Sequence, residues 1–108
     1  MKQYQCIVTI TMRGKGAVVV ELSKREGAQG GTILHGKGSS IHETKKLFGG
    51  LLEPEREVVL TLVEKEKVDA VMKAIQEGMK LNQIGKGILF VLDVEDVAGL
   101  TKIDSDKG

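Results

Sequence analysis

The fold is decided by residues 57–93, which read EVVLTLVEKEKVDAVMKAIQEGMKLNQIGKGILFVLD. The segment begins and ends with short apolar runs, at residues 58–63 and 88–93, and both runs predict strands. Between them, apolar residues recur at intervals of three and four, which places on one helical face Val68, Val71, Met72, Ile75 and Met79. The segment therefore predicts a strand, a helix over residues 65–80 and a second strand.

The same plan occurs earlier, in residues 4–35. Residues 4–12 are rich in β-branched side chains and predict a strand. Residues 17–25 predict a helix that ends at Gly27, and residues 31–35 predict a short second strand. The resulting βαββαβ order predicts an α+β domain of the ferredoxin-like class. In that class an antiparallel four-stranded sheet carries both helices on one face.

Both faces of the predicted sheet are apolar. Successive strand residues point to opposite faces, so Leu60 and Leu62 share one face while Val59 and Val63 share the other. Two helices cover only one face, and a large uncovered apolar face marks an interaction surface. We therefore expect a homo-oligomer that packs through its sheets, with a monomer as the alternative.

Length and composition limit the classes of function. The 108 residues suffice for one domain, which we place at residues 1–98 with a flexible tail at 99–108. The net charge of +1 gives no reason to expect nucleic acid as a partner. No apolar run reaches the roughly 20 residues of a membrane-spanning helix, so no membrane insertion is expected. The single cysteine, Cys6, and an N-terminus without a signal-peptide profile predict a cytoplasmic protein.

The segment between the second and third predicted strands, residues 36–55, has no clean periodicity. It contains four glycines, two serines and the single proline of the chain. An irregular stretch of this length in a compact domain is usually functional or mobile, and residues 41–48 predict a helical turn within it. Its lysines and acidic residues favour a surface that docks on a target protein, with a solvated loop as the bland alternative.

Two short glycine-flanked segments occupy equivalent places in the two halves. They are Gly36-Lys37-Gly38, after the second strand, and Gly85-Lys86-Gly87, before the fourth. Such glycines expose backbone N–H groups that bind anions, and each central lysine adds positive charge. Tight turns also need glycine, so a purely structural role is the alternative at both places.

These junctions resemble those of the PII family of nitrogen-regulatory signal proteins, over about residues 4–98. Residues 31–38 are similar to the family's second strand and its entry into the long T-loop, and residues 81–91 to its glycine-rich B-loop and the strand that follows. The resemblance implies a cytoplasmic homotrimer that is not an enzyme and requires no cofactor. It further implies an adenine nucleotide effector (ATP, ADP or AMP) bound between subunits, and regulation of a target protein through the loop at residues 36–55.

The same resemblance implies which residues contact the effector. On one side of the cleft we expect Thr32, Gly36, Lys37 and Gly38, and on the other Gly85, Lys86 and Gly87. Among the chain's departures from the family's pattern, two concern phosphate binding. Ile88 stands where the family has a phosphate-binding lysine, and residues 98–101 contain none of the family's phosphate-binding arginines.

Two other classes of function, a metal-binding protein and a small enzyme, are alternatives to a signalling protein. His35 and His42, with Cys6 nearby, raise the alternative of a trimeric metal-binding protein resembling the CutA type, although their spacing fits no compact ligand motif. A small enzyme is disfavoured because the chain carries no Walker A motif and no nucleophile elbow.

Overall fold

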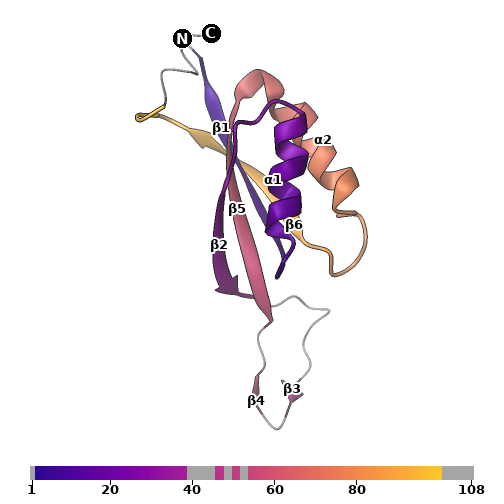
Figure 1. Ribbon diagram of the computed structural model, residues 1–108. Helices are drawn as coiled ribbons and strands as arrows, with labels where there is room; N and C mark the ends of the chain where they lie inside the picture. Colours follow the sequence, from indigo (N-terminus) through magenta and orange to yellow (C-terminus); the bar gives the residue numbers. More distant parts are fainter. Residues whose placement is uncertain (1, 39–45, 48–49, 52–53, 101–108) are drawn as a thin grey trace.

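The computed structural model describes residues 2–38, 46–47, 50–51 and 54–100. Figure 1 shows a sheet with two helices on one side, and with the β3–β4 ribbon beyond the end of the sheet where β2 stops and β5 starts. Along the chain the elements are β1 (Tyr4–Met12), α1 (Gly16–Arg25), β2 (Thr32–Lys37), β3 (Lys46–Leu47), β4 (Gly50–Leu51), β5 (Glu55–Glu64), the 3₁₀ turn η1 (Lys65–Lys67), α2 (Val68–Gly78) and β6 (Ile88–Val94).

The main sheet has the strand order β2-β5-β1-β6, and all three neighbouring pairs are antiparallel. Its register aligns Ile7 of β1 with Thr61 of β5 and Val91 of β6. The crossed order arises because each helix returns the chain over the same face before the next strand is added. The predicted ferredoxin-like fold, with both helices on one face, is confirmed.

The core lies between that covered face and the two helices. Ile7 and Val59 of the sheet are fully buried, as are Val19 of α1 and Ile75 of α2. The periodicity that predicted the second helix is the reason, because its apolar stripe is the surface that packs on the sheet. The remaining buried members of the cluster are Ala28, Val63, Val68, Val71 and Met79.

The helices differ from their predicted bounds where the backbone tightens or turns. The predicted helix at residues 65–80 was too long, since Lys65–Lys67 form a 3₁₀ turn and α2 ends at Gly78. Lys80 then adopts a φ of 56°, and the N–H of Leu81 donates to Gln76 O at 3.0 Å. That geometry closes a helix end. Helix α1 ends in the same way at Gly27, whose φ is 106°, as predicted.

The irregular segment predicted at residues 36–55 is partly ordered into strands. Gly36 and Lys37 continue β2, and Glu55 begins β5, because these residues pair across the two strands. A β3–β4 ribbon stands where part of the helical turn was predicted, so that prediction is wrong at Lys46–Leu47. The rest of it lies outside the described residues, as does most of the predicted tail. No helix in the described part of the chain is long and apolar enough to cross a membrane.

Candidate functional site

The segment Gly85-Lys86-Gly87, called here the glycine turn, leads into β6 in a conformation that requires glycine. Gly85 has a φ of 81° and Gly87 a φ of 131°, values that side-chain-bearing residues rarely adopt. A Cβ at Gly87 would also overlap the carbonyl oxygen of Ile10. The turn therefore lies directly against β1, and no larger residue fits at position 87.

A side-chain contact adds to this packing. The hydroxyl of Thr11, at the end of β1, lies 3.4 Å from the carbonyl oxygen of Lys86 and donates to it. Thr11 is buried, with only 1% of its surface exposed. The glycine turn is thus held by one strand of the sheet, through a close backbone approach and through one hydroxyl.

The second glycine-flanked segment lies at the end of β2. Lys37 is exposed and pairs with Glu55 across the strands, and the N–H of Gly38 donates to Pro54 O at 3.1 Å. This pairing closes the base of the segment between β2 and β5. Gly36 has open space where a Cβ would stand, so its place in the strand does not depend on glycine.

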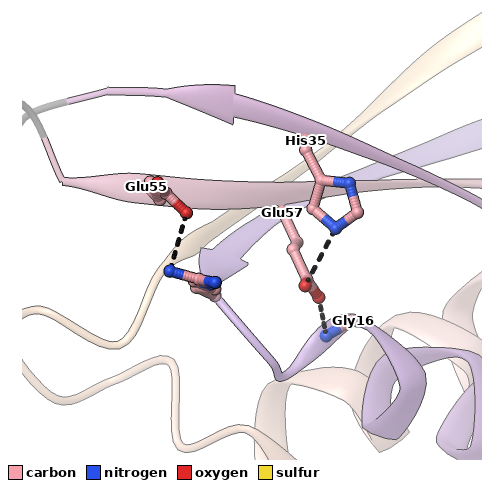
Figure 2. A network of polar contacts seen from close by, with 5 residues as sticks. Gly16, His35, Glu55 and Glu57 are labelled. Carbon is pink, nitrogen blue, oxygen red and sulfur yellow. Dashed lines mark hydrogen bonds and ion pairs between the residues drawn. The ribbon is translucent and has the colours of Figure 1, made fainter.

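A buried carboxylate ties this strand end to the start of α1. Figure 2 shows Glu57 of β5 between Gly16 and His35. The N–H of Gly16 donates to Glu57 Oε1 at 2.7 Å, and His35 Nε2 lies 3.2 Å from Glu57 Oε2. A Cβ at Gly16 would come within 2.6 Å of Glu57 Oε1. Glycine at this position is therefore what allows the carboxylate to reach the helix.

The surroundings of Glu57 favour its charged form. Hydrogen bonds from the backbone N–H groups of Gly14 and Gly16, helped by His35, hold the pKa of the Glu57 carboxyl below its ordinary value of 4.5, against burial, which raises it. The carboxylate also satisfies N–H groups that the first turn of a helix leaves without partners. Beside it, Arg13 and Glu55 form an exposed ion pair at 3.0 Å.

Sequence reasoning missed Arg13 and Thr11. It interpreted Glu57 as one acidic residue of a docking surface or solvated loop, which is wrong because Glu57 is buried in β5. The sequence does contain a signal for Glu57. Alternation along β5 puts it on the same face of the strand as Val59 and Val63, which is the face that the helices cover. A charge among inward positions indicates a paired or hydrogen-bonded group. Its partner, Gly16, lies 41 residues away in the chain, so no local pattern identifies it.

Thr32 lies away from both glycine segments. It begins β2 and pairs with Leu60, five residues along the strand from Lys37. There it lines a cavity of about 250 Å³. The other residues that line this cavity are Tyr4, Gly27, Gln29, Gly30, Gly31, Leu60, Leu62, Glu64 and Leu100.

The predicted contacts are therefore not assembled within one chain. The end of β2 and the glycine turn lie at the same end of the sheet, but on opposite edges, with β5 and β1 between them. Three strand spacings of about 4.8 Å separate these edges by about 14 Å. A ligand that contacts both segments of one copy would have to span this distance.

On the other face of the sheet, called here the uncovered face, the described residues place no helix (Figure 1). It is apolar in all four strands, and its side chains stay partly exposed at Leu34 (48%), Ile88 (58%), Phe90 (41%) and Leu92 (51%). The register places these in continuous rows with Cys6, Val8, Ile10, Val58, Leu60 and Leu62.

The metal alternative finds no support in the described residues. Among them, no three histidine, cysteine, aspartate or glutamate side chains come together as a metal site would require. His35 faces Glu57, whereas Cys6 lies on the uncovered face, so these two do not converge. His42 lies outside the described residues.

Comparison with known proteins identifies the family. The family described as nitrogen regulatory protein P-II matches residues 4–102, which include both glycine segments. The chain belongs to this family. A P-II homolog from Arabidopsis thaliana is 35% identical over 91 residues, which are 84% of this chain and 41% of that protein. This P-II protein therefore spans less than half the length of that curated relative.

A solved structure agrees on the fold. The crystal structure of Arabidopsis thaliana PII bound to citrate matches with a TM-score of 0.71 and 24% identity, over 91% of this chain and 83% of that one. The P-II family is one of regulators rather than enzymes. The glycine turn, the end of β2 and Glu57 of this P-II protein all lie inside the matched range.

Proposed function

We propose that this P-II protein is a cytoplasmic signal-transduction regulator whose effector is an adenine nucleotide, with ATP, ADP and AMP as the candidates. The observation that carries the proposal is the glycine turn. It has two glycines at positive φ on either side of a lysine. The turn packs against β1 immediately before β6 begins. Backbone N–H groups and a lysine at such a turn attract phosphate oxygens.

The proposed effector site is completed between copies of the chain. The end of β2 contributes Gly36, Lys37 and Gly38 from one copy, and the glycine turn contributes Gly85, Lys86 and Gly87 from another. The separation of these segments on opposite sheet edges supports this division. Thr32, with its cavity, adds a third contact region suited to a less polar part of the ligand, because Leu60 and Leu62 line the cavity too.

The proposed assembly is a homotrimer. It is supported by the uncovered face, because the apolar side chains that this face exposes on β2 and β6 form the kind of surface that stable proteins cover. A closed ring of identical copies buries the same patch on every subunit. Copies joined in this way would bring the edge of one sheet near the edge of the next.

Regulation would act through the segment between β2 and β5, with a target protein as the partner. A ligand on Lys37 would contact the strand end from which this segment leaves the sheet. Such a ligand shifts the segment's conformation only as far as it binds one conformation better than another. The pairing of Gly38 with Pro54 is the described contact that such a shift would change first.

Isothermal titration calorimetry with ATP, ADP and AMP tests the effector. Wild-type protein should bind one of them, and Lys86→Ala should weaken that binding about tenfold or more, because it removes one charged contact to phosphate. Lys73→Ala, a change of an exposed lysine on α2, is the control and should leave affinity unchanged. Equal affinity for wild type and Lys86→Ala would remove Lys86 from the site. No binding of any of the three nucleotides would overturn the proposed effector.

A further inference from the structure

Three threonines lie on the covered face of the sheet, and only one of their hydroxyls has a hydrogen-bond partner among the described residues. Thr9 and Thr61 are fully buried without a partner for Oγ1. Thr11 is equally buried, but its hydroxyl donates to Lys86 O in the glycine turn. Only this third hydroxyl therefore reaches the turn that Lys86 occupies.

The geometry of a peptide unit gives that contact a consequence. The Lys86–Gly87 bond is trans, since the described residues contain no cis peptide bond. In a planar trans unit the C=O and the next N–H point in opposite directions. A Lys86 carbonyl directed toward Thr11 therefore directs the N–H of Gly87 away from Thr11, which is the orientation that an anion outside the turn requires.

The opposite orientation of this peptide would be unfavourable for an anion. A half-turn of the Lys86–Gly87 unit would aim the carbonyl oxygen outward, where its partial negative charge would repel a phosphate. Glycine at position 87 leaves the backbone unusually free to make such a rotation. Gly87 approaches Ile10 closely, and the Lys86 carbonyl has the Thr11 hydroxyl as its hydrogen-bond donor in the observed orientation.

We propose that Thr11 is a positioning residue for anion binding. Its hydroxyl holds the Lys86 carbonyl inward and thereby presents the N–H of Gly87 to phosphate. This inference rests on the proposed function, because it concerns the same site, but it adds a residue that never touches the ligand. At 3.4 Å the contact is long for a hydroxyl donor, so the expected effect is modest.

The test compares three variants in calorimetric titrations with ADP and with inorganic tripolyphosphate. Thr11→Val keeps the branched shape and removes the hydroxyl, and should weaken binding of both probes about two- to tenfold. Thr11→Ser retains a hydroxyl and should bind like wild type. Thr61→Val removes a buried hydroxyl that has no described partner and serves as the matched control, with unchanged affinity expected.

A second measurement, on the ligand-free wild type, needs no substitution. Residual dipolar couplings of the Gly87 amide report the direction of its N–H bond. A bond that points away from Thr11 supports the proposal, and one that points toward Thr11 overturns it. This readout decides the matter even if Thr11→Val fails to fold.

The outcomes separate this inference from the function on which it rests. If wild type binds tripolyphosphate and Thr11→Val binds it equally well, Thr11 has no positioning role and the proposed effector site stands. If Thr61→Val weakens binding as much as Thr11→Val, the effect is a general one on the core, which also overturns the inference. If wild type binds neither probe, the anion site itself is overturned, and the role of Thr11 falls with it.

Discussion

The two faces of the sheet differ in how their polar residues are distributed. The covered face, which packs on α1 and α2, contains the polar side chains Thr9, Thr11, Glu57 and Thr61. The uncovered face is mostly apolar, and its polar residues are Thr32, Arg56 and Glu64. In an antiparallel sheet with one solvated face, the polar residues are expected on the solvated side.

This difference indicates which groups each face contacts. Polar groups on the covered face partly find theirs within the chain, as Glu57 does at Gly16 and Thr11 at the glycine turn. The uncovered face has no such partner in the described chain, and its apolar side chains lose water only against another molecule. One face therefore supports the candidate site, and the other is suited to assembly.

The largest expected effect comes from placing one charge on either face at adjacent positions. Val59→Asp puts an unpaired carboxylate among fully buried core residues, and we expect it to cost about 4 kcal/mol or more and to unfold the domain. Val58→Asp makes the same change on the uncovered face. It should leave a folded protein that no longer assembles. Circular dichroism and light scattering after size exclusion measure both results.

Either of two results from these variants would contradict the prediction. A folded Val58→Asp protein that keeps the oligomeric state of wild type would show that the uncovered face is not the interface. A Val59→Asp protein that melts like wild type would contradict the assignment of the covered face as the core.

A smaller effect is expected in how the free energy of unfolding depends on pH, because of Glu57. Because its folded pKa lies below the ordinary 4.5, Glu57 contributes stability at higher pH that is lost as pH falls from about that value through the folded pKa. Glu57→Gln lacks this contribution. It should be less stable than wild type at pH 7, and the gap should narrow in acid.

Urea unfolding at pH 7 and at pH 3 measures that gap. Glu55→Gln is the control, because Glu55 is half-exposed in its ion pair with Arg13 and such pairs contribute about 0–1 kcal/mol. Parallel pH profiles for wild type and Glu57→Gln would contradict the role assigned to the carboxylate.

The smallest effect is a gain. Thr9→Val makes the covered face more like the uncovered one by replacing a buried hydroxyl that has no described partner with a methyl group. We expect an increase of about 1 kcal/mol in the free energy of unfolding, measured by urea denaturation. A loss of stability instead would mean that the hydroxyl is hydrogen-bonded, for example to an internal water.

Local patterns predicted much of the fold. Alternation along the strands and the apolar stripe at Val68, Val71 and Ile75 placed the main elements, because each depends on neighbours a few residues away. The patterns missed the β3–β4 ribbon and the first residues of β5. The first residues of β5 pair with a strand that is distant in the chain, as Glu55 does with Lys37, and such pairing is not a local property.

The sequence predicted the glycines of the candidate site, together with Thr32, Lys37 and Lys86, but none of the side chains that pack against the glycines. The glycines at positions 85 and 87 stand out in the sequence because few residues tolerate positive φ. The side chains that hold them do not stand out. Thr11 looks like any strand threonine until β1 and the glycine turn are brought together across 75 residues of chain.

The sequence by itself determined the order of the elements, which strand residues share a face, and where glycine is needed, since all three follow from the geometry of short stretches of backbone. Only the tertiary structure decided which face of the sheet the helices cover. That choice depends on the handedness of the crossovers and on how both helices pack at once. The same choice buries Glu57 against α1 and leaves the apolar rows on the opposite face without a helix.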